Sequence, residues 1–475
     1  MRKTKIICTI GPASSDRQTL KALMQAGMNV ARLNFSHGTH AEHLEKINLI
    51  KEVRRELGLH VAIMLDTKGP EIRTGNFEKG EVSLRQGQEF TLTTREVAGN
   101  ETICSVSYKE LPSDVKAGDR ILIDDGLIAL TVKKIKDHDI VCRVDNPGVV
   151  KNHKGINVPG VKINLPAVTE QDIEDIRFGV ENEIDLLAAS FIRKKEDVED
   201  VRAALESCGG EDVFVISKIE NKEGVENIAE IIEASDGIMV ARGDLGVEIP
   251  VEEVPIIQKR VIRRCNFEGK VVVTATQMLD SMIRNPRPTR AEVTDVANAI
   301  LDGTDVIMLS GETASGKYPV EAVETMVEIA RTAENALNYD EIVRERSYLR
   351  DYGITNAIAH ATCTSAHGLK ATAILAPTSS GRTAFAVAKF KPKTPIIAFT
   401  DQIATARKLS ICWGTSVLLI GKSEHENQIF EDAIAMAKGR GLIEDGDTVI
   451  ITAGVPVLSG GGTNMMRINV VGTGF

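Results

Sequence analysis

Short runs of apolar residues recur along the chain and alternate with longer stretches that have one polar face. The runs have the length of single strands, and several are apolar at nearly every position, which is typical of parallel strands buried on both faces. We predict eight such strands, at residues 5–10, 29–33, 61–65, 184–189, 213–219, 237–240, 271–275 and 306–309.

The stretches between these runs have helical periodicity. In residues 225–232, the apolar residues Val225, Ile228, Ile231 and Ile232 share one face, with charged residues opposite, which predicts a helix. Repeated strand–helix units in one chain favour an α/β fold of the (β/α)8 TIM barrel type, with the helices outside.

The repeat is interrupted once, between residues 65 and 184. Segments 81–84, 89–93, 120–123 and 127–132 alternate apolar and polar residues and are separated by glycines. This pattern is typical of antiparallel strands with one solvated face. We therefore predict an inserted all-β lid domain at 70–167, between a first barrel part at 1–69 and a second at 168–338. Thr169 is expected to cap the helix that follows.

A second α/β region follows the barrel, at residues 339–475. Its strand candidates are residues 372–376, 395–399, 416–420, 448–452 and 467–471, with helical stretches between them. This order predicts a smaller C-terminal α/β domain with an open sheet.

Charge and cysteine content narrow the class of protein. The 475 residues carry 57 Lys and Arg against 67 Asp and Glu, a formal net charge of −10, which argues against general nucleic-acid binding. Seven scattered cysteines, with no Cys-x-x-Cys pair, suit a reducing compartment. No run approaches ~18 consecutive apolar residues. We expect a cytoplasmic protein with no nucleic-acid or membrane partner.

Polar residues of complementary chemistry follow most of the predicted barrel strands, where the functional residues of such barrels lie. Any one of them could be a solvated loop residue or a helix cap, but their joint placement favours a site. They are the cations Arg32, Arg73 and Lys218, the carboxylates Asp66, Glu220 and Asp244, and the hydroxyls Ser36, Thr67 and Thr276.

This set of side chains restricts the chemistry. Glu220 and Asp244 are hard oxygen ligands on neighbouring strands and suit a Mg²⁺ ion that keeps positions open for substrate oxygens. Nearby Arg and Lys suit phosphate binding and the stabilisation of negative charge in a transition state. No Ser-His-Asp order is present, and no Gly-x-Gly-x-x-Gly follows a strand, so triad hydrolysis and hydride transfer are disfavoured.

Two other motifs have plainer interpretations. Residues 311–317 match most of a phosphate-binding P-loop, but Tyr318 stands where a Ser or Thr would hold Mg²⁺. His37, His40 and His43 have the spacing of a metal cluster, and a solvated helix start is the favoured alternative.

Several longer segments resemble the pyruvate kinase family, in family order and over essentially the whole chain. They are residues 31–38, 64–75, 217–221, 239–246, 276–279, 285–292 and 308–314. The resemblance implies a barrel, a β lid and a C-terminal effector domain in a cytoplasmic homotetramer. It implies transfer of the phosphoryl group of phosphoenolpyruvate to ADP, giving pyruvate and ATP, the final step of glycolysis.

The resemblance also implies roles for single residues. Lys218 would stabilise the transferring phosphoryl group and the enolate oxygen, Arg32 would bind phosphate, and Thr276 would lie beside the carbon that takes up a proton. Substrate contacts are expected from Gly243, Asp244 and Thr276, in addition to Arg32 and Lys218.

Cofactor and nucleotide contacts follow from the same resemblance. Mg²⁺ (or Mn²⁺) would be held by Glu220 and Asp244. Glu71, in the Gly-Pro-Glu-Ile-Arg motif, resembles members that depend on K⁺, whereas members with Lys there tend to be K⁺-independent. The expected K⁺ ligands are Asn34, Ser36, Asp66 and Thr67, and the expected nucleotide contacts are Asn34, Phe35, Ser36, His37, Arg73 and Lys154.

The C-terminal domain contains a candidate phosphate pocket. The resemblance implies a phosphorylated effector, a sugar phosphate or a nucleotide, bound by Thr378, Ser379, Ser380, Gly381, Thr383, Gly460 and Gly461. On local sequence alone, the glycine-rich turn at 459–464 is equally an anion nest or a flexible turn.

Two rival functions fit parts of the pattern. A Mg²⁺-dependent aldolase or lyase of 2-oxo acids would use residues 218–221, but it needs neither the insertion nor the C-terminal domain. A non-catalytic metabolite sensor has no need to keep Lys218, Glu220, Asp244 and Thr276 together. Consumption of ADP distinguishes these functions from phosphoryl transfer.

Overall fold

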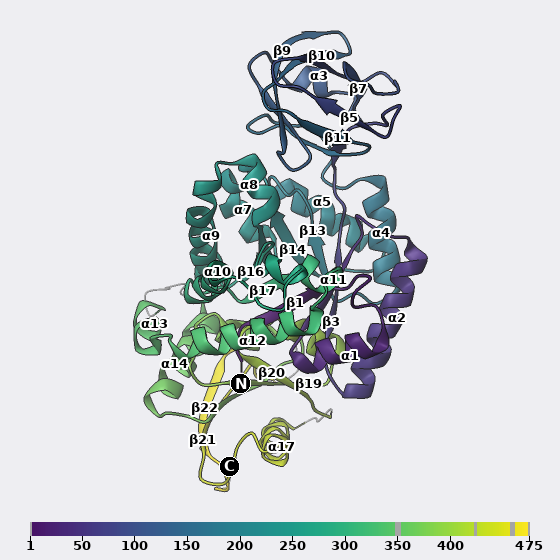
Figure 1. Cartoon of the computed structure of the whole chain (residues 1–475). Coiled ribbons are helices and arrows are strands. Elements are labelled where there is room, and N and C mark those ends of the chain that lie inside the picture. The colour runs from purple at the N-terminus through teal and green to yellow at the C-terminus, as the bar shows by residue number, and fades with distance from the viewer. Residues whose placement is uncertain (1, 347–352, 422–424, 457–460, 474–475) are drawn as a thin grey trace.

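The computed structural model describes residues 2–346, 353–421, 425–456 and 461–473. A central barrel carries an inserted domain at one end and a C-terminal domain at the other (Figure 1). The fold class predicted from the sequence is confirmed, whereas the exact domain boundaries stay a prediction.

The barrel consists of eight parallel strands that form a closed ring in the order β1-β17-β16-β15-β14-β13-β3-β2. β1 pairs with both β2 and β17, and this double pairing closes the ring. Each strand overlaps one of the eight predicted runs. The strands are β1 (Lys5–Thr9), β2 (Val30–Asn34), β3 (Ala62–Asp66), β13 (Leu186–Ala189), β14 (Phe214–Ile219), β15 (Gly237–Ala241), β16 (Val271–Ala275) and β17 (Val306–Leu309).

Alternate strand residues belong to two separate apolar cores. Ile6 and Leu65 belong to the outer core, which also includes helix residues, whereas Ile7 and Met64 belong to the inner core that fills the barrel. The barrel helices are α1 (Arg17–Ala26), α2 (His40–Leu57), α4 (Glu170–Glu181), α5 (Lys195–Glu206), α6 (Lys222–Glu226), α7 (Ile228–Ala234), α9 (Val254–Glu268), α10 (Arg290–Leu301) and α12 (Pro319–Asn335). Two short helices, α8 (Arg242–Glu248) and α11 (Gly311–Ala314), follow β15 and β17 directly.

Side-chain caps begin several of these helices. Thr169 caps α4 as predicted, in a capping box with Asp172. The prediction of one helix over residues 225–232 is wrong, because α6 ends at Glu226 and α7 begins at Ile228. The residue between them, Asn227, donates its side-chain amide to the Arg193 carbonyl at 2.9 Å, and this tertiary contact accompanies the break.

The inserted domain lies between β3 and α4 and has its own apolar core, which includes Phe90, Leu130 and Ile140. A seven-stranded sheet has the order β4-β12-β8-β9-β10-β6-β7, and β5 pairs with β11. A single helical turn, α3 (Leu111–Asp114), was not predicted. The strands are β4 (Ile72–Arg73), β5 (Glu81–Leu84), β6 (Glu89–Thr93), β7 (Ile103–Ser105), β8 (Arg120–Ile123), β9 (Ile128–Lys136), β10 (Asp139–Val144), β11 (Gly148–Lys151) and β12 (Gly155–Asn157).

The C-terminal domain has one open sheet in the order β20-β19-β18-β21-β22, and only β22 runs antiparallel to its neighbour. The five predicted strands are present within one or two residues. The elements are α13 (Tyr339–Arg346), α14 (Ile354–Gly368), β18 (Ala373–Pro377), α15 (Arg382–Ala388), β19 (Ile396–Thr400), α16 (Ile403–Lys408), β20 (Thr415–Leu419), α17 (Glu426–Gly439), β21 (Thr448–Ala453) and β22 (Met465–Val470).

Buried polar contacts join the C-terminal domain to the end of the barrel opposite the insertion. Lys391 forms an ion pair with Asp305, which lies just before β17. The Lys5 ammonium donates to the Thr415 carbonyl at 2.6 Å, and Arg407 lies 3.4 Å from Asp185. Among the described residues, no helix has the length and apolarity needed to cross a membrane.

Candidate active site

Three charged side chains from three strands meet at the carboxyl end of the barrel. Arg32 at β2 donates to Asp66 at β3 over 2.6 Å, and Lys218 in β14 donates to the other Asp66 oxygen over 3.0 Å. Burial alone would raise the pKa of Asp66, but Arg32 and Lys218 outweigh it and hold this pKa below its ordinary value. Asp66 is therefore a carboxylate that fixes two cations next to one another.

Lys218 contacts a second carboxylate. Its ammonium lies 3.0 Å from Glu220 and 2.8 Å from the Ser190 hydroxyl. Burial lowers the pKa of Lys218, but Asp66 and Glu220 raise it by more, so its pKa lies above the ordinary value. The side chain is thus a permanent cation at the centre of the barrel rim.

Glu220 and Asp244 have the charge and burial expected of metal ligands. Burial raises the pKa of each carboxyl group, and Asp244 adds to the effect on Glu220. The Phe191 amide donates to one Glu220 oxygen at 2.6 Å. A buried and a partly buried carboxylate that repel one another are stabilised by a divalent cation, and few protein ligands leave positions for substrate oxygens. The donor set therefore fits Mg²⁺.

Thr276 has a strained backbone. It follows β16 with φ 67°, and Gln277 follows with φ 53°, a region that β-branched residues rarely adopt. Arg242 donates to the carbonyl oxygens of Ala275 and Thr276, at 3.2 and 2.8 Å, and holds this turn. The Thr276 hydroxyl accepts the Gly243 amide at 2.8 Å. Three predicted substrate-binding residues, Gly243, Asp244 and Thr276, thus come from two adjacent strand ends, whereas the sequence assigned no role to Arg242.

The expected K⁺ ligands lie at the ends of β2 and β3. Asn34 and Asp66 are direct partners in the strand register. The Asn34 side-chain oxygen accepts the Ser36 amide at 3.2 Å, and the Thr67 hydroxyl accepts the Ser190 amide at 3.1 Å. The four residues thus lie at the ends of two adjacent strands and in the segments that follow them, and their assignment to a K⁺ site stays a prediction.

The expected nucleotide contacts divide between the barrel and the inserted domain. Arg73, on β4, pairs with Glu71 at 2.6 Å and donates to the His153 carbonyl at 2.8 Å. Lys154 pairs with Asp124 at 2.9 Å. Arg73 and Lys154 therefore belong to the insertion, whereas residues 34–37 belong to the barrel.

The histidines after β2 have separate partners. The His43 ring is buried and stacks on Phe35 with centroids 4.0 Å apart, so the predicted solvated helix start is wrong for this residue. His40 pairs with Asp175 at 2.6 Å and stacks on Phe178. Aromatic packing therefore accounts for His40 and His43, whereas His37 is exposed.

The two parts of the expected effector pocket come together through hydroxyl groups. Thr378 accepts the Gly381 amide at 3.0 Å, and Thr383 lies 2.9 Å from Thr463, which follows the glycine-rich turn. Gly461 is described, whereas Gly460 lies outside the described residues. Ser379 and Ser380 belong to the loop that precedes α15.

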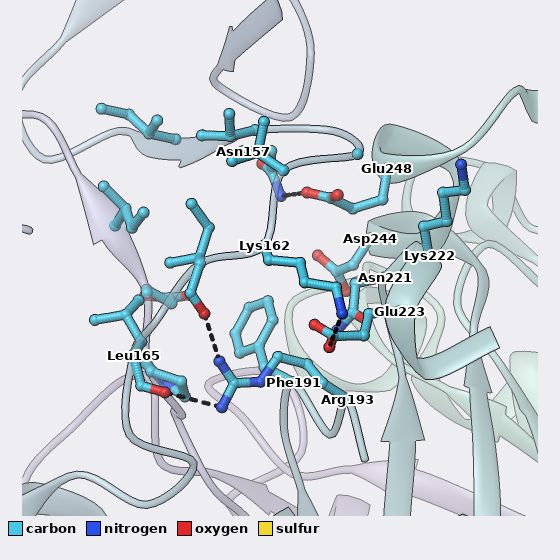
Figure 2. Close-up of a pocket in the computed structure, with 18 of the residues that line it drawn as sticks. Asn157, Lys162, Leu165, Phe191, Arg193, Asn221, Lys222, Glu223, Asp244 and Glu248 are labelled. Carbon is cyan, nitrogen blue, oxygen red and sulfur yellow. Dashed lines mark hydrogen bonds and ion pairs between the residues drawn. The ribbon is translucent and has the colours of Figure 1, made fainter. Parts of the chain in front are cut away.

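An open cleft of about 220 Å³ separates the inserted domain from the barrel rim, and Glu71, Asp125 and Asp244 line it. Figure 2 shows the polar links across it. Asn157 of the inserted domain donates to Glu248 of α8 at 2.9 Å. Arg193 donates to the carbonyl oxygens of Ile163 and Leu165, at 2.8 Å each. The sequence did not identify these links, because they join segments far apart in the chain.

Comparisons with known proteins give the same assignment along the whole chain. The family model "Pyruvate kinase, barrel domain" matches residues 1–323, and "Pyruvate kinase, alpha/beta domain" matches residues 356–469. A pyruvate kinase of Clostridium acetobutylicum is 52% identical over 99% of this chain and 100% of its own length. One from Geobacillus stearothermophilus is 53% identical over 99% of this chain and 80% of its own.

A solved structure extends the comparison to the fold. The crystal structure of a pyruvate kinase from Cryptosporidium parvum has a TM-score of 0.94 and 42% identity, covering 99% of this chain and 96% of that one. The fold and the matches to family models and relatives together identify a phosphotransferase built on a barrel. The chain belongs to the pyruvate kinase family.

Proposed function

We propose that the cluster at the carboxyl end of the barrel transfers the phosphoryl group of phosphoenolpyruvate to ADP. The observation that carries this proposal is the permanent Lys218 cation, 3.0 Å from Asp66 and 3.0 Å from Glu220. Negative charge develops on the phosphoryl and enolate oxygens during transfer, and a fixed cation stabilises it most in the transition state. Glycolysis would use this reaction as its final step.

The other residues have positioning roles in this proposal. Arg32 binds the phosphate and is itself held by Asp66. Gly243 and Asp244 contact the substrate, and Thr276 lies on the side from which the enolate carbon takes its proton. The fixed backbone of Thr276 keeps its hydroxyl in one place, which favours protonation on one face of the enolate.

Glu220 and Asp244 would hold Mg²⁺ or Mn²⁺, which supplies Lewis-acid stabilisation of substrate oxygens when bound. Asn34, Ser36, Asp66 and Thr67 would hold K⁺. Arg73, Lys154 and residues 34–37, including Phe35 and His37, would contact ADP. The inserted domain would then close over the nucleotide across the open cleft.

Replacement of Lys218 by Met tests the proposal. The variant should fold and bind phosphoenolpyruvate but lose at least a hundredfold in turnover, because one well-placed cation contributes ~3 kcal/mol or more to the transition state. Pyruvate formation, coupled to oxidation of a nicotinamide cofactor, measures turnover. The exposed Lys393 provides a matched Lys→Met control. Near-normal turnover of Lys218→Met would contradict the assignment of Lys218 as the residue that stabilises the transition state.

We further propose a cytoplasmic homotetramer that a sugar phosphate or a nucleotide activates. The hydroxyl groups of Thr378, Ser379, Ser380 and Thr383, with the backbone of Gly381 and of residues 460–462, would bind the effector phosphate. Deletion of residues 460–462 should abolish activation and spare the basal rate. If none of a panel of such phosphates changes the saturation curve for phosphoenolpyruvate, these residues do not form an effector pocket.

A further inference from the structure

Ser190 lies at the centre of the barrel rim, directly after β13, with 4% of its surface exposed. Its hydroxyl oxygen is 2.6 Å from the Thr67 carbonyl oxygen and 2.8 Å from the Lys218 ammonium. The sequence pattern assigned no role to this residue. It nevertheless joins the end of β3 to the proposed transition-state stabiliser on β14.

The direction of these hydrogen bonds follows from the groups involved. A serine hydroxyl has one hydrogen, and both the Thr67 carbonyl oxygen at 2.6 Å and the Asp66 carboxylate at 3.4 Å can only accept. The hydroxyl donates to the nearer of the two, Thr67. The lone pairs that remain accept from the Lys218 ammonium, which can only donate. The Ser190 amide also donates to the Thr67 hydroxyl at 3.1 Å. Two bonds thus fix the serine to Thr67 and orient its oxygen toward Lys218.

Lys218 has three N–H groups and three acceptors nearby. The acceptors are Asp66 at 3.0 Å, Ser190 at 2.8 Å and Glu220 at 3.0 Å. Asp66 is fixed by Arg32, and Ser190 is fixed by Thr67. Glu220 would also bind the metal ion in the proposed function, so we take its contact with Lys218 as the one that a substrate oxygen replaces. The two fixed acceptors then determine where the third N–H group points.

We propose that Ser190 is a positioning residue that, together with Asp66, orients the Lys218 ammonium toward the transferring phosphoryl group. This inference rests on the role of Lys218 in the proposed function. Without the serine oxygen, the ammonium keeps only its contacts with Asp66 and Glu220, and it samples other orientations once a substrate oxygen replaces the Glu220 contact. Such misorientation reduces stabilisation of the transition state more than binding of the substrate, because the substrate phosphate is also held by Arg32.

Kinetics of Ser190→Ala and Ser190→Thr test the proposal, with Ser207→Ala, an exposed serine on the outside of the barrel, as the control. Ser190→Ala should lower kcat by about tenfold to a hundredfold, the usual effect of one lost hydrogen bond to a charged group. The KM for phosphoenolpyruvate should change by less than about threefold. Ser190→Thr keeps the hydroxyl and should regain most of kcat.

Parallel measurements separate this proposal from its premise. Circular dichroism and thermal unfolding show whether each variant is folded, and Ser190→Gly replaces Ser190→Ala if the latter unfolds. Unchanged kcat in a folded Ser190→Ala, with Lys218→Met inactive, overturns the positioning role alone. Ser190→Ala could instead lose kcat and substrate affinity equally, with no recovery in a folded Ser190→Thr. That result would show a merely structural role for Ser190 and would also overturn the positioning role. An active Lys218→Met overturns the proposed function itself.

Discussion

Asp66 connects the charges of the candidate site. One of its oxygens accepts from Arg32 and the other from Lys218, so a single buried carboxylate keeps two cations close together despite their repulsion. Their repulsion is offset only while Asp66 is ionised. The low pKa of this group follows from the same two contacts, and it keeps the arrangement intact over the physiological range of pH.

Glu71 should determine the requirement for K⁺. Its carboxylate pairs with Arg73 and lines the open cleft, where it adds negative charge. A cation in the proposed K⁺ site offsets such charge near the substrate phosphate, and nearby unit charges interact by a few kcal/mol at an effective dielectric constant of ~20. We predict low activity in tetramethylammonium buffer, restoration by K⁺, and a much weaker K⁺ dependence in Glu71→Lys.

Activity titrated with K⁺ at constant ionic strength measures this effect. Glu71→Gln, which removes a charge without adding one, is the control and should keep most of the dependence. Full activity of the unaltered enzyme without K⁺ would falsify the prediction.

At the residue scale, groups with distinctive chemistry can be recognised in the sequence, whereas groups whose role depends on geometry cannot. Lys218, Glu220 and Asp244 stood out because charged residues of complementary chemistry follow several predicted barrel strands together. Ser190 and Arg242 did not, because their roles depend on which carbonyl oxygens face them across neighbouring strands. The aromatic partner of His43 was hidden for the same reason.

At the scale of elements, the segment after β16 is held in place by helix α10. Glu292 in the first turn of α10 forms a capping box with Thr289 and accepts from both the amide and the hydroxyl of Ser281, at 2.7 and 2.6 Å. Ser281 lies a few residues beyond Thr276. A helix cap therefore also anchors a segment of the candidate site.

The stabilising effect of Glu292 should depend on pH. Burial raises the pKa of its carboxyl group, but hydrogen bonds from Ser281 and Thr289 outweigh this and lower it overall. A lowered pKa in the folded state means that the stabilisation is complete above the unfolded value of ~4.3 and is lost as the pH falls through the folded value. We predict that Glu292→Gln lowers the free energy of unfolding by about 1 kcal/mol at pH 7. Below about pH 4 the two proteins should become more nearly equal in stability.

Chemical denaturation of both proteins across this pH range measures the difference. Glu324→Gln, at an exposed position on α12, is the matched control and should have little effect at any pH. A cost that is the same at pH 7 and at pH 3 would contradict a role for the ionised carboxylate.

The linker that returns from the inserted domain is held by Arg193. Its guanidinium donates to two linker carbonyl groups and pairs with Asp197 at 3.0 Å. Arg193→Ala removes both bonds to the linker, each of which contributes about 1 kcal/mol. We predict that amide hydrogens of residues 158–167 exchange roughly tenfold faster or more, because local opening becomes easier.

Hydrogen exchange followed by mass spectrometry measures this change. Arg177→Ala, at an exposed position on α4, should leave the exchange rates of the linker unaltered. Equal protection in Arg193→Ala would mean that other contacts hold the linker.

Periodicity predicted the eight barrel strands and the five C-terminal strands in their order, because burial on one or both faces leaves a direct pattern in the sequence. In the insertion it identified β5, β6, β8 and β9 and missed the other five strands. It failed at the break between α6 and α7. The apolar face is continuous through residues 225–232, and the interruption accompanies the bond from Asn227 to a carbonyl on another loop. The turn of α3 is too short to establish any period.

At the scale of the whole molecule, buried charge joins the barrel to the C-terminal domain. Lys391 and Asp305 are both buried, and the other Asp305 oxygen accepts the Val272 amide of β16 at 2.9 Å. Burial lowers the pKa of Lys391 to about 8, although Asp305 opposes the shift. The pair therefore connects the C-terminal domain to two adjacent barrel strands.

Lys391→Met should destabilise the protein by about 3 kcal/mol, because loss of one partner leaves a buried, uncompensated carboxylate. The double variant Lys391→Met with Asp305→Asn should recover part of the loss. Denaturant unfolding of the single and double variants measures the coupling, and Lys393→Met is the exposed control. Additive effects of the two substitutions would show that the pair is not coupled.

Because the first and last strands close the barrel, β1 must wait for its second partner while the chain is being synthesised. Thr9 and Leu309 hydrogen-bond across that seam although they lie 300 residues apart. At 5–20 residues per second, synthesis of the intervening chain takes roughly 15 to 60 s. During that time β1 has no partner for one edge. Arg2, Lys3 and Lys5 border its apolar run, and charges at such positions discourage strands of neighbouring nascent chains from pairing with it.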